Sequence, residues 1–122
     1  MPRASATAHE LSQITLLGAL PGERLARLAK KMRREDVAVG AAPVVEGDEG
    51  DRFYVVLTGI FAVSKLGGLG PRAVLRPGAY FGEVALAMHI PRTATVRALT
   101  PSTVASCDQE TFDEFVRPLF AD

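Results

Sequence analysis

The chain has 122 residues, enough for one domain with a substantial core and too few for two. Apolar residues make up 48% of it, which indicates a globular protein and not a disordered one. Its 14 basic and 14 acidic residues give a net charge of zero, which argues against a nucleic-acid-binding surface.

The first third of the sequence predicts a leader followed by two helices. Residues 1–9 are small and mostly polar and are interpreted as a leader or linker, so that the domain proper spans residues 10–122. Residues 9–17 predict a short helix, and Pro21 suits the first turn of a second one. Apolar residues then recur with amphipathic-helix spacing at Leu25, Leu28, Ala29 and Met32. Basic residues occupy the opposite face, which is more often solvated than a site for an anionic partner: Arg24, Arg27, Lys30, Lys31, Arg33 and Arg34.

From Glu35 onward, short β-rich runs alternate with turn residues, the pattern of an all-β sandwich or barrel. Residues 53–58 form the strongest predicted strand, and further strands are expected at 37–39, 43–46, 60–65, 72–76, 93–98 and 103–107. Residues 67–71 are glycine-rich but lack the Lys and Ser/Thr of a P-loop, so they predict a hairpin tip. Asp108 suits the N-cap of a C-terminal helix, which Pro118 is expected to kink or end.

Several kinds of site and location are disfavoured by what the sequence contains. No apolar run approaches 18 residues, so we expect no membrane span. Cys107 is the single cysteine, which excludes an internal disulfide and suits a reducing, cytoplasmic compartment. We expect it to be buried in its strand as a small apolar residue. The two histidines, His9 and His89, have no paired cysteines, so we expect no metal site and no cofactor.

Residues 81–98 carry the candidate site. Gly82 has no Cβ, so a ligand can approach its backbone closely, and residues 83–88 suit a helical turn whose N-terminus favours phosphate. Arg92 offers a planar fork for phosphate oxygens, and Thr93 adds a hydroxyl beside it. Glu83 would repel a phosphate, but it can accept a hydrogen bond from a hydroxyl such as a ribose 2′-OH. The set predicts a nucleotide site for a compact, singly charged phosphate.

A structural interpretation of the same residues remains open at this stage. Glu83 could simply occupy the first turn of a helix, where acidic residues are favoured. Arg92 could be a solvated surface arginine, or it could be the ion-pair partner of Glu83.

Two stretches resemble the cyclic nucleotide-binding domain family. Residues 81–86, FGEVAL, followed by residues 91–96, PRTATV, are similar to the phosphate-binding cassette of that family, and residues 46–59 resemble the barrel segment before it. The resemblance covers residues 10–120. It implies a mainly β fold with flanking helices: an eight-stranded jelly-roll β-barrel with N-terminal helices, a short cassette helix and a C-terminal helix.

The resemblance also assigns roles to individual residues. It implies that Glu83 holds the ribose 2′-OH, that Arg92 holds the cyclic phosphate, and that backbone N–H groups and the Thr93 hydroxyl complete the phosphate site. The implied ligand-binding residues are Gly82, Glu83, Val84, Ala85, Arg92, Thr93 and Ala94. The family senses its ligand without chemistry, so we expect no enzyme. The ligand favoured is cAMP, and cGMP stays an alternative because a hydroxyl at Thr93 can bond a syn guanine.

The output of such a sensor is left open by the sequence. Neither the longer base-capping helix nor the helix-turn-helix of some family members is found, so we expect either a stand-alone sensor or the regulatory domain of a larger protein. The effector could then be a transporter, channel, kinase or other enzyme. Two further readings are a degenerate jelly-roll module used only for protein–protein contacts and a cupin-like enzyme. The latter is disfavoured because cupins need several inward-facing histidines.

Overall fold

The computed structural model describes residues 5–68 and 70–120, and in that part of the chain seven strands form two sheets. The strands are β1 Arg33–Val37, β2 Arg52–Thr58, β3 Phe61–Ser64, β4 Ala73–Leu75, β5 Tyr80–Phe81, β6 Thr95–Ala98 and β7 Ser102–Asp108. The four-stranded sheet has the order β1-β7-β2-β5, and the three-stranded sheet has the order β4-β3-β6. The strand pairs of these two sheets are antiparallel.

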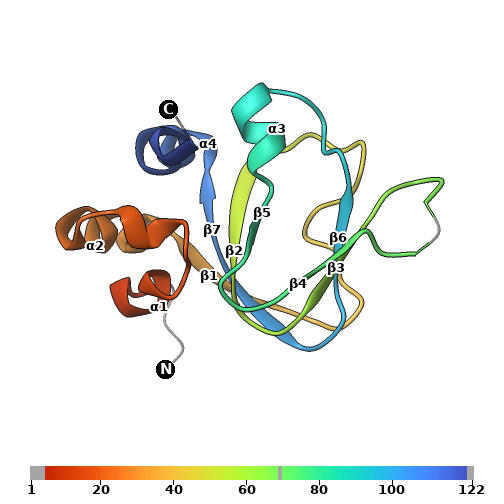
Figure 1. Cartoon of the computed structure of the whole chain (residues 1–122), viewed down its shortest axis with the longest axis horizontal. Coiled ribbons are helices and arrows are strands. Elements are labelled where there is room, and N and C mark those ends of the chain that lie inside the picture. The colour runs from red at the N-terminus through yellow and green to blue at the C-terminus, as the bar shows by residue number, and fades with distance from the viewer. Residues whose placement is uncertain (1–4, 69, 121–122) are drawn as a thin grey trace.

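Helices cover one side of the four-stranded sheet, whereas α3 lies at one end of the strands (Figure 1). The α-helices are α1 Ala8–Ser12, α2 Gly22–Lys31, α3 Glu83–Met88 and α4 Gln109–Thr111. They are supplemented by the 3₁₀ turns η1 Leu17–Ala19 and η3 Arg117–Phe120 and by the π-helical turn η2 Phe112–Val116. Among the described residues, no helix has the length and apolar character that a membrane crossing requires.

Strand β2 is the centre of the fold because it is covered on both faces. Successive side chains of a strand point to opposite sides. Phe53 and Val55 therefore join the core beneath the helices, whereas Tyr54 and Val56 join the core between the two sheets. Burial on both faces explains why this stretch reads as a continuous apolar run without polar alternation.

The two cores confirm the main periodicities of the sequence. The predicted apolar face of α2 is buried against the four-stranded sheet, and the strand predicted at residues 53–58 lies within β2. Cys107 is fully buried, and burial raises the pKa of its thiol to about 12, so it is not a reactive thiolate. Asp108 caps the C-terminal segment by accepting a hydrogen bond from the Thr111 N–H at 2.9 Å, as predicted.

The prediction that Arg33 and Arg34 belong to the basic face of the second helix is wrong. Helix α2 ends at Lys31, and Arg33 and Arg34 belong to β1, where they pair with Ser106 and Ala105 of β7. Two arginines favour a helix by propensity, but ladder pairing with β7 overrides that weak preference. The strand predicted at 37–39 therefore begins earlier and ends at Val37.

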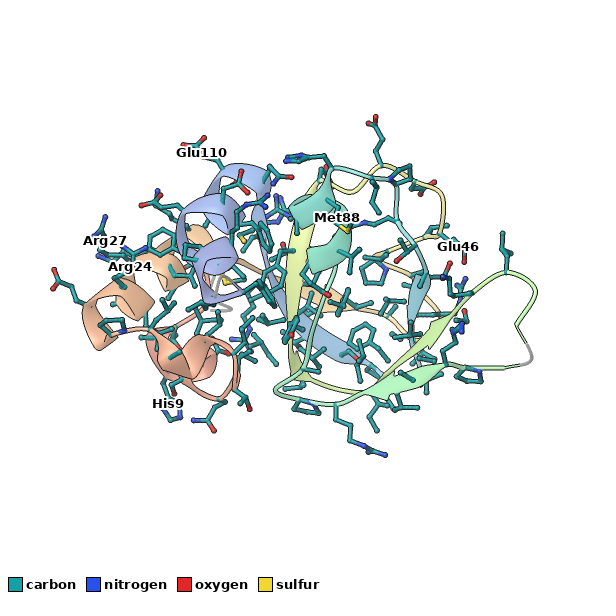
Figure 2. The ribbon with its side chains drawn as sticks, turned by 45° about the horizontal axis from the view of Figure 1, so that its top comes forward. His9, Arg24, Arg27, Glu46, Met88 and Glu110 are labelled. Atoms are coloured by element: carbon teal, nitrogen blue, oxygen red, sulfur yellow. The ribbon has the colours of Figure 1, made fainter. Side chains whose placement is uncertain are left out.

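Contacts between α2 and the C-terminal segment involve the arginines that remain on the helix (Figure 2). Arg24 donates a hydrogen bond to the Glu114 carbonyl at 3.2 Å, and its Cζ lies 4.7 Å from the centre of the Phe115 ring. Arg27 lies over the same ring at 6.0 Å. These two cations therefore hold helices from opposite ends of the chain together.

The eight-stranded closed barrel expected from the resemblance is not found in the described residues. Residues 43–46, predicted as a strand, form only one isolated bridge, between Val44 and Val96. Pro43 has no backbone N–H, so this segment cannot extend a regular ladder beside β6. Conversely, the two-residue strand β5 was not predicted, because so short a segment shows no period of its own.

Residues 5–9, interpreted from the sequence as part of a leader, contact the rest of the domain. Ser5 bridges Arg33, and the buried Ala6 donates its N–H to the Met32 carbonyl at 3.0 Å. Thr7 forms a capping box with Glu10 at the start of α1, and this helix is shorter than the one predicted for residues 9–17. Residues 1–4 of the same segment lie outside the described residues.

Gly59, between β2 and β3, should tolerate no side chain. Its φ is 90°, and an added Cβ would overlap the side chain of Ser102. We expect Gly59→Ala to lower the free energy of unfolding by about 2–5 kcal/mol, from left-handed strain plus overpacking. Urea denaturation measures the loss. Gly18→Ala is the control, since nothing lies within 4 Å of a Cβ there. Equal stability of the two variants would contradict this account.

Candidate ligand-binding site

All seven residues predicted from the cassette line one pocket, together with apolar residues from distant strands. The described residues that line it are Val44, Val63, Leu75, Tyr80, Phe81, Gly82, Glu83, Val84, Ala85, Arg92, Thr93, Ala94 and Val96. Both sheets contribute, because Val63 and Leu75 come from β3 and β4, whereas Tyr80 and Phe81 form β5. The pocket thus has a polar side at the cassette and an apolar side on the strands.

The start of α3 is shaped by Gly82. This residue is the N-cap and has φ 90°, in the left-handed region that favours glycine. An added Cβ would lie 3.0 Å from both the Arg52 carbonyl oxygen and Arg92 Nη1. Glycine is therefore required here by conformation and by space, and it allows the first turn of α3 to approach both groups.

Arg92 is buried, with only 5% of the residue exposed. Its Nη1 donates to the Gly82 carbonyl at 3.0 Å, and its Nη2 donates to the Arg52 carbonyl at 2.8 Å. In the described part of the chain no ion pair joins Arg92 to Glu83. The geometry therefore rules out both structural interpretations of Arg92, as a solvated surface arginine and as the salt-bridge partner of Glu83.

Burial sets the electrostatics of the two charged groups in the pocket. It lowers the pKa of Arg92, although the nearby Tyr54, Asp51 and Glu83 oppose the shift. Burial likewise raises the pKa of Glu83, against a hydrogen bond from its own backbone and the positive charge of Arg92. One desolvated cation and one desolvated carboxylate thus share the pocket, and each favours a ligand group that restores its lost solvation.

Gly50 contributes to the site in a way that the sequence analysis missed. An added Cβ would lie 2.5 Å from the Ala85 Cβ and 3.1 Å from the Arg92 Cζ. The nearby Gly47 lies in a turn, with φ 91°. Gly50 has no positive φ, so its role is to leave space for α3 and the guanidinium. This role becomes visible only in the folded structure, where Ala85 and Arg92 lie next to Gly50.

The apolar wall of the pocket was also missed. Its members, Val44, Val63, Leu75 and Val96, lie on segments separated by up to 52 residues in the chain. Each looks like an ordinary strand residue, and no local signal marks it for a site. The strand register brings them together: Val63 is paired with Val96 in the three-stranded sheet, and Val44 forms its isolated bridge with the same Val96.

The arrangement suits a small anionic ligand with an apolar part. A guanidinium has five N–H donors, and two of those on Arg92 are engaged by carbonyls, which leaves donors for an anion. Glu83 can accept from a ligand hydroxyl. Within the described residues, no group of three His, Cys, Asp or Glu side chains is placed to hold a metal ion. Fold and pocket together define a mainly β domain whose pocket has one buried cation on its polar side.

Comparison with known proteins places this domain in a family. The family model for the cyclic nucleotide-binding domain matches residues 34–118, so the chain belongs to that family. A cAMP-dependent protein kinase regulatory subunit of Yarrowia lipolytica is 38% identical over 109 residues, or 89% of this chain. The regulatory domain of Toxoplasma gondii PKA, co-crystallised with cAMP, has a TM-score of 0.83 at 28% identity and matches 92% of this chain and 44% of its own.

The chain spans only 29% of the length of the Yarrowia lipolytica relative, which is a regulatory subunit. A regulatory subunit of a cAMP-independent protein kinase A from Trypanosoma brucei has a TM-score of 0.86 at 22% identity, covering 92% of this chain and 41% of its own. At that identity the likeness shows the fold alone. Since that protein is described as cAMP-independent, the fold does not define the ligand, which must be argued from the pocket.

Gly50→Ala tests whether space at this position controls the site. We expect the added methyl group to displace Arg92 or α3 and to lower the free energy of unfolding by about 1–3 kcal/mol. The side-chain Nε–H signal of Arg92 in ¹⁵N NMR should shift at the same time. Gly22→Ala is the control, because nothing lies within 4 Å of a Cβ there. An unchanged Arg92 signal in Gly50→Ala would show that the guanidinium does not depend on Gly50.

Proposed function

We propose that this pocket binds a cyclic nucleotide monophosphate, with cAMP favoured over cGMP, and that the domain acts as a regulatory sensor. The observation that carries the proposal is the burial of Arg92, which is oriented by the Gly82 and Arg52 carbonyls and shares a pocket with Glu83. Neutral carbonyls do not neutralise a buried guanidinium, so a phosphate offers it a better partner.

Each part of the ligand has a counterpart in the pocket. The cyclic phosphate carries one negative charge and would meet Arg92, the Thr93 hydroxyl and the first backbone N–H groups of α3. The ribose 2′-OH would donate to Glu83. The base would lie against the apolar wall that includes Val63 and Leu75. Gly82, Val84, Ala85 and Ala94 would complete the contacts to sugar and phosphate.

The preference for cAMP is supported by relatives and by the apolar wall. The Yarrowia lipolytica relative is named as cAMP-dependent, and the Toxoplasma gondii structure holds cAMP. Adenine has no exocyclic carbonyl that needs a donor from the wall. The Thr93 hydroxyl keeps cGMP as the second candidate, because it is the group in the cassette able to bond guanine.

The regulatory role is supported by the same comparison. The Yarrowia lipolytica relative is a regulatory subunit. Among the described residues that line the pocket, Glu83 is the single carboxylate, so they offer no pair of acids for hydrolysis. We propose that ligand binding controls an attached or partner effector, with a protein kinase favoured over a transporter, channel or other enzyme. The competing function is a degenerate module that contacts proteins and binds no nucleotide.

Thermal denaturation with cAMP, cGMP or AMP tests the proposed function. A ligand at about a hundred times its dissociation constant adds about 2.7 kcal/mol, so cAMP should raise the Tm by several degrees. AMP, which carries an open and more highly charged phosphate, should have a smaller effect. Arg92→Ala should bind about ten- to hundredfold more weakly, since a charged hydrogen bond is lost. Arg92→Lys should not fully restore binding, since an ammonium cannot form the planar fork. If neither cyclic nucleotide shifts the Tm of the folded wild type, the competing function is correct.

The role of Glu83 can be isolated by removing its proposed partner. Calorimetry should show that the wild type binds 2′-deoxy-cAMP more weakly than cAMP, whereas Glu83→Ala binds the two almost equally. The two deletions are then non-additive, as expected for groups in contact. Glu49→Ala, an exposed acidic residue outside the pocket lining, should keep the wild-type discrimination. Additive losses would mean that Glu83 acts only on the stability of α3.

A further inference from the structure

The C-terminal segment, residues 109–120, reaches the far end of the cassette helix through Arg117. Arg117 Nη1 donates to the Ala87 carbonyl at 3.0 Å, and Nη2 donates to the Leu86 carbonyl at 3.0 Å. The last carbonyls of a helix have no donor within the helix, and a cation there also suits the helix dipole. Arg117 therefore caps α3 from a different element, and α3 and α4 lie next to each other (Figure 1).

The guanidinium of Arg117 is held in place by its own segment. Its Nε donates to Asp113 Oδ1 at 2.9 Å, and its Cζ lies 5.6 Å from the centre of the Phe112 ring. Gln109 Nε2 donates both to the same Asp113 oxygen at 2.9 Å and to the Leu86 carbonyl at 3.0 Å. The Arg117 guanidinium is therefore already oriented by its own segment, so its bonds to α3 cost little side-chain entropy.

The backbone that carries Arg117 departs from a regular α-helix. Residues Phe112–Val116 form a π-helical turn, and the Arg117 N–H bonds to the Phe112 carbonyl five residues back. Such turns are rare and occur frequently at functional sites. Pro118 has no N–H and cannot return the chain to an α-helical ladder. The π turn thus rotates Arg117 relative to the rest of the segment, toward the end of α3.

A second contact connects the same segment to the pocket. Phe120 packs edge-on against Tyr80, with ring centres 5.8 Å apart, and Tyr80 lines the pocket. Helix α3 itself has six residues and is therefore about 9 Å long. Its first turn, at Glu83 and Ala85, lines the pocket, while its last carbonyls bond Arg117. Because α3 is so short, a displacement of its first turn also displaces its last residues.

We propose that Arg117 is a positioning residue for the cyclic nucleotide: its bonds to the last carbonyls of α3 set this helix relative to Arg92 and thereby contribute to ligand affinity. This inference rests on the proposed function of the pocket. The coupling is reciprocal, because whatever the Arg117 bonds contribute to ligand affinity, the ligand contributes to the Arg117 bonds.

The test measures cAMP affinity by calorimetry and amide hydrogen exchange with and without cAMP. Arg117→Met keeps the length of the side chain but removes its donors. We expect it to weaken cAMP binding by about two- to thirtyfold. The slower exchange that cAMP induces at residues 112–117 in the wild type should be lost in this variant. Arg97→Met is the matched control: Arg97 is exposed, donates to the Gly40 carbonyl and is not among the residues that line the pocket, so both readouts should match the wild type.

Two further variants keep the test decisive if Arg117→Met does not fold. Asp113→Asn removes the carboxylate that orients the guanidinium and should weaken binding in the same direction. Arg117→Lys should bind with intermediate affinity, because an ammonium can donate to one carbonyl but cannot span two as a planar fork.

The outcomes separate this inference from the proposed function. A wild type that binds cAMP, with variants that lose thermal stability but keep both affinity and ligand-induced protection, would show that Arg117 is purely structural and overturn the inference alone. A folded wild type that binds no cyclic nucleotide would overturn the proposed function and the inference with it.

Discussion

The site depends on keeping the Arg92 guanidinium away from water. Burying a charge without partners is strongly unfavourable, and breaking its contacts leaves an uncompensated ion. The carbonyls of Gly82 and Arg52 supply partial compensation, one from the start of α3 and the other from β2. The guanidinium thereby fixes the cassette to the central strand. Because carbonyl dipoles carry no net charge, the positive charge is still available to an anion that enters the pocket.

Strand β2 connects this charged centre to the rest of the molecule. Its Tyr54 ring stacks on Phe81 of the pocket lining, with centres 4.9 Å apart. On the opposite face, the Phe53 ring lies 5.4 Å from Phe112 of the C-terminal segment. Adjacent residues of one strand therefore contact the pocket and the segment that contains Arg117. The two cores share a rigid element, so they do not shift independently.

The parts of the fold predictable from the sequence are those set by neighbours along the chain. The seven residues predicted as a site, in 82–85 and 92–94, do line one pocket, because a glycine start, a short helix and a following arginine form a local structure. The burial of Leu28 on α2 and the cap at Asp108 are local in the same sense. The placement of Arg34 in β1 was not predictable, because it depends on pairing with β7 across about 70 residues. The space made by Gly50 and the wall at Leu75 likewise exist only once distant strands are in register.

Helix α3 is too short to be stable by its own hydrogen bonds, since isolated helices of fewer than about 12 residues are marginal in water. Its position must therefore come from groups outside it, and these act at both ends: Arg92 at the Gly82 carbonyl, and Arg117 at the last carbonyls. Between them, the buried Leu86 anchors the helix in the same core as Phe112. An element held by a few contacts has alternative positions that differ by only a few kcal/mol. A ligand can shift such an equilibrium only by its difference in affinity for the two positions. A phosphate on Arg92 and the first turn of α3 would supply that difference at the end of the helix opposite Arg117, and this separation is what allows a binding event to be transmitted to another element.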